Sequence, residues 1–303
     1  MRAVSRAPGR WLSALLTLAL LLSCSSCLFG RIFYFNTPTL SAPDDFDDRL
    51  VRASSHPRPF ERAREQVSFP MREARSASYP SFEDLLSEND TRAMLVLHHD
   101  VIVYERYFGA VTAETRLPSF SMTKTFAAVL MGCAAREGLI GSVDQRLVDF
   151  VPSFAEKPGF GEITLEHLLR MTSGIDFAEE SPAGAMFYYS TDLRSRTRAY
   201  GLKWRPGQHY QYGSINAQLL WEVLHQRIGA KTVAAYFEER LWDALGAERA
   251  AAWSLDSAEH GVEKFSSGLS ATARDYARLG LLFQHGGSVG GRRVISARWV
   301  ADS

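Results

Sequence analysis

Hydrophobic periodicity becomes regular only after residue 80. Two strongly apolar runs, 93–97 and 101–108, flank the polar tripeptide His98-His99-Asp100, and this arrangement predicts a β-hairpin. A short capped helix is expected before it, at 81–86. Longer helical patterns follow at 143–151, 164–171, 215–228, 232–245 and 272–285. A strand hairpin followed mainly by helices predicts an α+β or mixed α/β domain.

The segment 31–80 has a different pattern, because it is polar and contains six prolines. Proline removes a backbone donor and interrupts regular structure. An acidic cluster at 44–48 lacks the glycine and the terminal glutamate of an EF-hand loop, so we interpret it as a solvated turn. We therefore expect 31–80 to form an extended polar tether that precedes a folded domain at 81–303.

The first thirty residues, 1–30, have the pattern of an export signal. Three arginines precede a leucine-rich stretch, and small residues follow it. Leu21-Leu22-Ser23-Cys24 resembles a bacterial lipobox, which would make Cys24 a lipidation site. The alternative is an uncleaved anchor, since 11–30 carries no charge and has about the length that spans a bilayer. Both interpretations tether the domain to the membrane on its outer side, in the periplasm or on the cell envelope.

Composition narrows the class of function. The chain has 303 residues, 46% of them hydrophobic, with 34 basic and 34 acidic side chains. This neutral balance, without a basic run or a nucleic-acid motif, argues against a nucleic-acid partner. The three cysteines have no zinc-ligand spacing, and Cys133 is expected to be a small buried residue. The simplest nucleotide-binding and zinc-protease motifs are absent.

The candidate chemistry starts at Ser121-Met122-Thr123-Lys124. Residues three apart on a helix share a face, so an amine at Lys124 could activate the hydroxyl of Ser121 as a nucleophile. The run 126–135 that follows is apolar nearly all round and predicts a buried helix. Desolvation beside it would lower the pKa of Lys124, as a base requires. The alternative is a capped helix start with a solvated lysine.

A second candidate segment is Tyr212-Gly213-Ser214-Ile215-Asn216, at the start of the helix predicted at 215–228. Tyr212 beside a lysine could act as a proton shuttle, while Ser214 and Asn216 could donate or accept hydrogen bonds to a substrate. The alternative is ordinary helix capping by Ser214.

Four motifs together resemble the serine β-lactamase and penicillin-binding protein superfamily. They are Ser121-x-x-Lys124, Tyr212-x-Ser214, the segment 168–175 (Leu-Leu-Arg-Met-Thr-Ser-Gly-Ile) and the segment 268–278 (Gly-Leu-Ser-Ala-Thr-Ala-Arg-Asp-Tyr-Ala-Arg). The similarity runs from about residue 75 to the end of the sequence. Within the superfamily the chain looks most like the class C-related hydrolases, in particular 6-aminohexanoate-dimer hydrolases and esterases.

The resemblance implies a fold and a set of roles. The expected fold is an antiparallel sheet flanked by helices plus a helical lobe, with the site between them. Ser121 would form an acyl-enzyme with a small-molecule or peptide acyl substrate, Lys124 would assist its deprotonation, and Tyr212 would relay the proton. The resemblance implies no cofactor and no metal. The general base is left open between the lysine and the tyrosine.

One motif of the superfamily is missing. A Lys/His-x-Gly strand is expected well after Trp299, whereas the sequence given reaches Ser303. His285-Gly286-Gly287 imitates it, but we interpret His285 as a helix C-terminal residue. The resemblance thus implies that later sheet strands are missing and that the hairpin has an unpaired edge. Three functions stay open: an exported serine hydrolase of amide, ester or β-lactam carbonyls, a catalytically impaired truncated homologue, and a penicillin-binding wall sensor.

Overall fold

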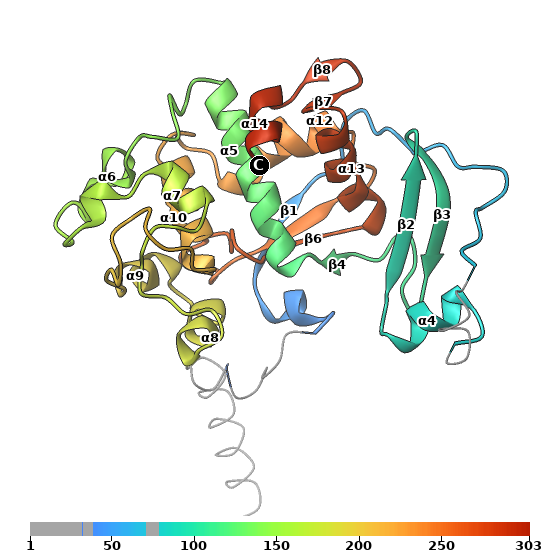
Figure 1. The fold of residues 1–303 in the computed structure, drawn as a ribbon, viewed down its shortest axis with the longest axis horizontal. Coiled ribbons are helices and arrows are strands. Elements are labelled where there is room, and N and C mark those ends of the chain that lie inside the picture. The colour runs from blue at the N-terminus through green and yellow to red at the C-terminus, as the bar shows by residue number, and fades with distance from the viewer. Residues whose placement is uncertain (1–31, 33–38, 71–78) are drawn as a thin grey trace, which may run out of the picture.

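The computed structural model describes residue 32, residues 39–70 and residues 79–303. These residues form a central sheet with a group of helices on one side and a separate hairpin on the other (Figure 1). The predicted export segment and Cys24 lie outside the described residues. Among the described residues, no helix combines the length and the apolar character that crossing a bilayer requires.

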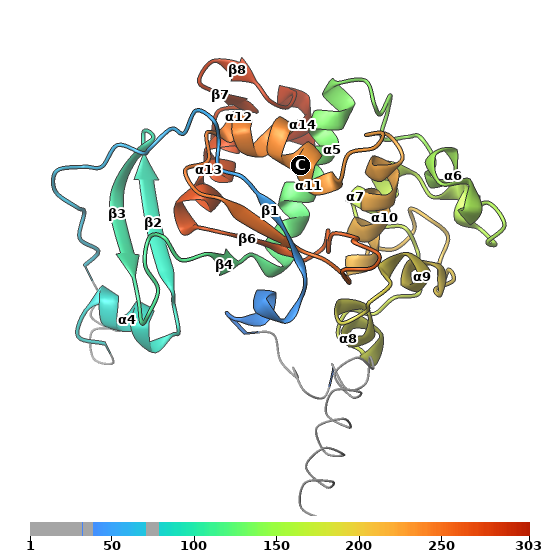
Figure 2. The same cartoon turned by 180° about the vertical axis from the view of Figure 1, so that it is seen from behind.

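Four antiparallel strands make up the central sheet, in the order β1-β5-β6-β4. They are β1 (Asp48–Val51), β5 (Ala251–Ser254), β6 (Leu269–Ala271) and β4 (Leu117–Pro118). Every residue of β5 and β6 is buried, so both faces of these inner strands are covered. Seen from behind, β1 and β6 lie in front of helix α5 (Thr123–Arg136), which packs on the other face of the sheet (Figure 2).

The edge strand β1 corrects the expectation of an extended tether over the whole of 31–80. Val51 pairs with Ala251 and is fully buried, whereas its neighbour Leu50 is 62% exposed. This alternation is that of a strand with one face on the core. The guanidinium of Arg49 also lies 2.7 Å from the fully buried carboxylate of Glu263. The strand has no clear signal in the sequence because its four residues include two charges and follow an acidic turn.

The predicted hairpin is confirmed as β2 (Ala93–His98) and β3 (Val101–Tyr107). Its turn residues, His99 and Asp100, both have positive φ, at 49° and 65°, as a two-residue hairpin turn requires. The outer edge of β3 is partly paired, in contrast to the unpaired edge expected from the sequence. Ile102 exchanges backbone hydrogen bonds with Glu61 and Ala63 there, each at 2.9 Å. Strand β2 has no fully buried residue.

Glu105 of β3 fastens the hairpin to the rest of the molecule. Its buried carboxylate accepts hydrogen bonds from Arg274 of helix α13 (Ala273–Gln284) at 2.6 and 3.0 Å and forms an ion pair with Arg62 at 2.7 Å. The hydroxyl of Tyr107 donates a third hydrogen bond at 2.6 Å. One carboxylate therefore joins three segments that are far apart in the sequence.

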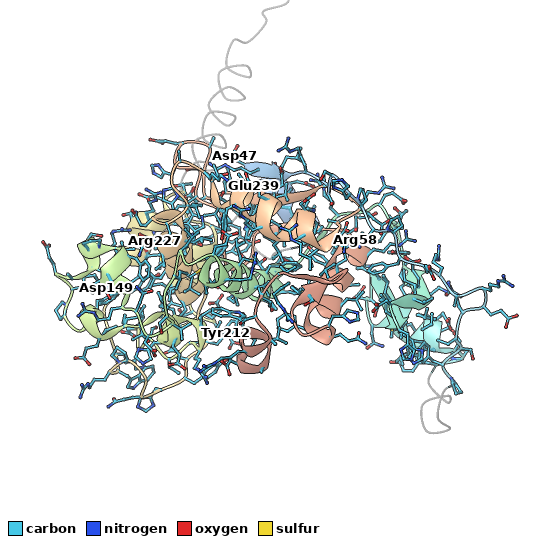
Figure 3. The ribbon with its side chains drawn as sticks, turned by 90° about the horizontal axis from the view of Figure 1, so that it is seen from above. Asp47, Arg58, Asp149, Tyr212, Arg227 and Glu239 are labelled. Carbon is cyan, nitrogen blue, oxygen red and sulfur yellow. The ribbon has the colours of Figure 1, made fainter. Side chains whose placement is uncertain are left out.

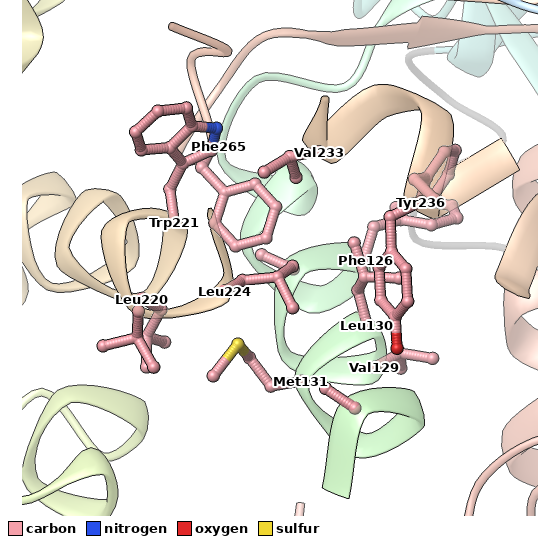
Figure 4. Packing of buried hydrophobic residues seen from close by; sticks show 14 of the residues in the cluster. Phe126, Val129, Leu130, Met131, Leu220, Trp221, Leu224, Val233, Tyr236 and Phe265 are labelled. Carbon is pink, nitrogen blue, oxygen red and sulfur yellow. The ribbon is translucent and has the colours of Figure 1, made fainter. Parts of the chain in front are cut away.

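The main hydrophobic core lies where α5 meets α10 (Ser214–His225). Phe126 and Leu130 of α5 and Trp221 and Leu224 of α10 are all at most 2% exposed and pack together (Figure 4). The prediction of a buried helix at 126–135 is confirmed, since most of its residues are buried, Cys133 among them. This core fixes the two helices at whose N-terminal ends the candidate motifs lie.

Most predicted helices are present with shifted ends. The segment 232–245 is one helical run, in which a π-helical turn separates α11 (Val233–Phe237) from α12 (Asp243–Leu245), and it ends at Gly246 with φ 69°. The helix predicted at 143–151 is reduced to α6 (Leu147–Phe150). The remaining helices are α4 (Phe82–Glu88), α6 (Leu147–Phe150), α7 (Leu165–Leu169), α8 (Pro182–Tyr188), α9 (Leu193–Arg198), α11 (Val233–Phe237), α12 (Asp243–Leu245) and α14 (Ala297–Asp302). The short turns are η1 (Ala42–Asp45), η2 (Phe120–Met122), η3 (Pro152–Phe154), η4 (Phe160–Glu162) and the π-turn η5 (Glu238–Trp242).

The interpretation of His285 is confirmed, because it is the C-cap of α13. The glycines after it turn the chain into a small hairpin of β7 (Ser288–Val289) and β8 (Arg292–Arg293). The ring nitrogen Nε2 of His285 lies 2.8 Å from a carboxylate oxygen of Asp100, in the turn of the β2–β3 hairpin. His285 thus supports the hairpin and lies away from the candidate nucleophile.

Candidate active site

Ser121 lies in the 3₁₀ turn η2, directly before α5. The residue before it, Phe120, has a φ of 42°, a left-handed conformation that costs energy for a residue with a side chain. The turn is held against β6, since Ser119 Oγ donates to the carbonyl of Leu269 at 2.8 Å and Thr123 Oγ1 accepts from its N–H at 3.2 Å. The strand therefore fixes the backbone that presents Ser121, which is exposed.

Lys124 lies beside the candidate nucleophile. Its Nζ donates hydrogen bonds to Ser121 Oγ at 3.0 Å and to the carbonyl of Ser266 at 2.9 Å. Lys124 is half-buried, whereas Ser121 is exposed to solvent. The pair predicted from the tetrapeptide spacing is thus in contact, and the bond to Ser266 aims the amine at the hydroxyl.

Tyr212 comes to the same place from the loop before α10. The Nζ of Lys124 lies 5.0 Å from the centre of its ring, a cation–π distance. Tyr212 is 37% exposed and lies at the surface, between the helical side and the hairpin side of the molecule (Figure 3). Within the described residues, no hydrogen bond joins its hydroxyl to Ser121 or Lys124.

Ser214 and Asn216, the two residues predicted to bind a substrate, lie in different surroundings. Ser214 lines the cavity at Ser121, but its hydroxyl and its N–H both donate to the carboxylate of Glu179, each at 2.6 Å. Asn216 is 3% exposed, and its side chain accepts from Ser173 Oγ at 2.6 Å and donates to the carbonyl of Gly213 at 3.2 Å. Asn216 thus ties the 168–175 segment to α10 and does not line the cavity.

A cavity of about 160 Å³ adjoins Ser121. Its walls come from the turn η2, the loop before α8, α8 itself, the start of α10 and the loop before β6. The lining residues are Phe120, Ser121, Glu179, Gly184, Phe187, Tyr188, Ser214, Ser266 and Ser267. Burial raises the pKa of Tyr188, which keeps its hydroxyl neutral. A larger cavity of about 730 Å³ lies between the hairpin turn and α13 and includes none of the predicted site residues.

Sequence reasoning missed Glu179, Ser266 and Ser267. Glu179 lies in an irregular loop, where neither periodicity nor spacing indicates a partner, and its contact with Ser214 exists only in the folded chain. Ser266 and Ser267 come shortly before the 268–278 motif, which is the one signal that could have led to them. Across the described residues, no three side chains of His, Cys, Asp or Glu gather as a metal site.

Comparisons with known proteins show the family of this chain. The Beta-lactamase family model matches residues 84–302. The 6-aminohexanoate-dimer hydrolase of Paenarthrobacter ureafaciens is 29% identical over 242 residues, which are 75% of this chain and 60% of that protein. The chain therefore spans about 60% of the length of this curated relative.

Solved structures show the same fold at lower identity. A Bacillus anthracis protein assigned to the 6-aminohexanoate-dimer hydrolases has a TM-score of 0.76 at 23% identity, over 87% of this chain and 72% of that one. A class C beta-lactamase from Rhodobacter sphaeroides has a TM-score of 0.54 at 21% identity, over 73% of this chain and 68% of that one. The α+β fold expected from the sequence is that of these proteins. The family match covers well over half of the chain and includes the Ser121-x-x-Lys124 and Tyr212-x-Ser214 motifs, so the chain belongs to the Beta-lactamase family.

Proposed function

We propose that this protein is a serine hydrolase that cleaves small amide or ester substrates through an acyl-enzyme on Ser121. The observation that carries the proposal is the 3.0 Å contact between Lys124 Nζ and Ser121 Oγ at the mouth of a cavity. A serine hydroxyl needs an adjacent base to become a nucleophile, and a lysine amine in contact with it meets that need. The relationship to a 6-aminohexanoate-dimer hydrolase favours a linear amide among the possible substrates.

The reaction proceeds in two halves. In the first, Ser121 Oγ bonds to the carbonyl carbon while its proton passes to the Lys124–Tyr212 pair, with Lys124 in its neutral amine form. The C–N or C–O bond then breaks, and the departing amine or alkoxide takes up that proton. In the second half, water gives a proton to the same pair, its oxygen bonds to the acyl carbon, and the acid leaves as Ser121 recovers its hydrogen.

Labelling of the full-length protein with a fluorophosphonate probe tests the proposal. Ser121 and Ser214 are two of the four serines that line the cavity, so Ser121→Ala and Ser214→Ala form a matched pair. We expect the wild type and Ser214→Ala to be labelled and Ser121→Ala to stay unlabelled. Labelling of Ser121→Ala at the wild-type rate would overturn the assignment. Deacylation measured on an ester substrate separates a hydrolase, which turns over, from a binding sensor, which stays acylated.

We also propose that the protein is exported and tethered to the membrane through 1–30, with Cys24 as the lipidated residue. The arginine-rich start, the leucine-rich stretch and the lipobox-like Leu21-Leu22-Ser23-Cys24 support this. Metabolic labelling with a fatty acid tests it: incorporation into the wild type but not into Cys24→Ala is expected. Equal incorporation into both would exclude Cys24, and membrane fractionation of both would show whether an uncleaved anchor holds the protein instead.

A further inference from the structure

We propose that Phe46, which lies between η1 and β1, is a positioning residue for the wall of the active-site cavity; the proposal rests on the acyl transfer proposed at Ser121. Phe46 is buried, with 9% of its surface exposed. It reaches the cavity through Tyr188, which contacts the ring of Phe46 and lines the cavity at Ser121. A segment far from the candidate motifs in the sequence thereby shapes the space in which a substrate lies.

The ring of Phe46 belongs to a cluster of three aromatic side chains. It meets the ring of Tyr188 edge-on, with centroids 5.5 Å apart and an interplanar angle of 85°. It stacks on Tyr189 with centroids 6.1 Å apart and an angle of 21°. The two tyrosine rings are themselves 4.9 Å apart and nearly perpendicular, at 86°. These are favourable geometries for aromatic pairs, so the position of Tyr188 is coupled to that of Phe46.

Lys264 joins Phe46 to Tyr188 a second time. Its Nζ lies 4.3 Å from the centre of the Phe46 ring and 5.6 Å from that of Tyr188, and it donates a hydrogen bond to the carbonyl of Tyr188 at 2.5 Å. Tyr188 is the last residue of α8, where a cation interacts favourably with the helix dipole. Lys264 is only 3% exposed, and an ammonium so deeply buried depends on such partners.

A small void lies behind the wall of the cavity. Phe120, Tyr188 and Ser267 line both the cavity at Ser121 and this void, so they form the partition between the two spaces. Phe46 and Lys264 lie on the far side of the partition. The void measures about 10 Å³, room for about one water molecule. Without the ring of Phe46 the void would be larger, and Tyr188 could retreat into it.

The backbone at Phe46 is fixed by the central sheet. The N–H of Leu255 donates to the carbonyl of Asp47 at 2.7 Å, and Asp48 pairs with Ser254 at the start of the β1–β5 ladder. The N–H of Phe46 itself donates to the carbonyl of Pro43 at 3.2 Å. The sheet thus holds the residue that supports the cavity wall, although the wall at Tyr188 is part of a short helix in the other lobe.

Stability alone is the simpler role for Phe46, because a buried aromatic side chain contributes to stability wherever it packs. A loss of stability would change the reaction of Ser121 with every probe to the same extent. A displaced wall would instead affect the probe that fills the cavity more than the probe that does not. Ser121 itself is held by β6 through Ser119 and Thr123, so we expect its reaction with a small probe to survive.

The test compares the rates at which two fluorophosphonate probes label Ser121 in the full-length protein. One probe carries a methyl group on phosphorus and the other a hexyl chain. We expect Phe46→Leu, which removes the ring but keeps an apolar side chain, to lower the ratio of the hexyl rate to the methyl rate about tenfold relative to the wild type. Phe46→Tyr keeps the ring and should restore the ratio. Leu282→Ala opens a cavity at a fully buried position of α13, and it should reduce stability without changing the ratio.

The results separate this inference from the proposed function. An unchanged ratio in Phe46→Leu, or an equal fall in Leu282→Ala, overturns the role of Phe46 and leaves the serine hydrolase standing. Absence of labelling of the wild type by both probes overturns the proposed function itself. If Phe46→Leu does not fold, Lys264→Met takes its place, because it removes the ammonium that joins Phe46 to Tyr188 and keeps an unbranched side chain. The same fall is expected there, and an unchanged ratio again contradicts the proposal.

Discussion

The Nζ atom of Lys124 lies 3.0 Å from the Oγ atom of Ser121 and is directed there by the carbonyl of Ser266, 2.9 Å from the same nitrogen. A lysine in this position is either a base or a fixed positive charge. The two roles differ in what they require, since only an amine that gives up its proton can accept the proton of the serine.

Lys124→Met and Lys124→Arg separate these roles. If Lys124 is the base, both variants lose at least about 100-fold in the labelling rate of Ser121, because arginine keeps the charge but stays protonated. Urea unfolding curves serve as the control for folding. A labelling rate of Lys124→Arg close to that of the wild type would show that charge alone suffices.

Glu105 should make the attachment of the hairpin sensitive to acid. Burial by itself would raise the pKa of its carboxyl, but hydrogen bonds from Arg274 and Tyr107, with the charges of Arg274 and Arg62, hold that pKa below its usual value. A carboxyl with a lowered folded pKa contributes stability above the ordinary glutamate pKa of about 4.3 and loses it as pH falls through the lower folded value. Glu105→Gln should therefore be less stable at pH 7, by about 3 kcal/mol, and should lose less stability between pH 5 and pH 3.

The control for Glu105 is a second contact between the hairpin and α13. His285→Ala removes the hydrogen bond between His285 and Asp100, two side chains that are each about half exposed. We expect a loss below about 1 kcal/mol in the free energy of unfolding. Equal losses in the two variants, measured by urea unfolding, would contradict the assignment of Glu105 as the main attachment.

Residues 48–51 should behave as part of the folded domain. Val51→Asp places an unpaired charge at a fully buried position and is expected to destabilise the protein by about 3 kcal/mol or more. Leu50→Asp makes the same chemical change at the adjacent position, which is 62% exposed, and should stay within about 0.5 kcal/mol of the wild type. Thermal unfolding of the two variants compares them directly, and equal midpoints would mean that this segment is a tether after all.

Cys133 should be unreactive in the folded protein. Burial raises the pKa of its thiol to about 12, so the thiolate is scarce at pH 8 and the sulfur is covered by the core. Iodoacetamide is therefore expected to modify Cys133 only after unfolding. Peptide mapping by mass spectrometry, with and without urea, measures this, and modification at similar rates in both conditions would show that α5 opens readily.

The sequence was informative where a segment is long and its pattern is regular. The hairpin at 93–108, the buried helix after Ser121 and the helix of His285 were all predicted, because each has a sustained apolar pattern. The motifs that identify the family are also local in sequence, which is why the match to residues 84–302 could be anticipated.

The remaining features depend on contacts between distant segments. Strands β5 and β6 have only four and three residues, too few for a pattern to show, and they exist because they pair with each other and with β1. Asn216 was expected to face a substrate, but the buried start of α10 turns it toward Ser173. The place of Glu179 follows from the folding of a loop onto Ser214, which no spacing in the sequence encodes.

Ser121 with Lys124, and the loops that face them, belong to different parts of the molecule. Ser121 and Lys124 stand on one short stretch that β6 anchors, whereas Glu179 and Tyr212 belong to loops of the helical lobe. We therefore expect changes in the loops of that lobe to leave the contact between Lys124 and Ser121 in place. For protein engineering, such a division predicts that libraries confined to the loop around Glu179 would change the wall of the cavity, while the contact between Lys124 and Ser121 is inherited unchanged.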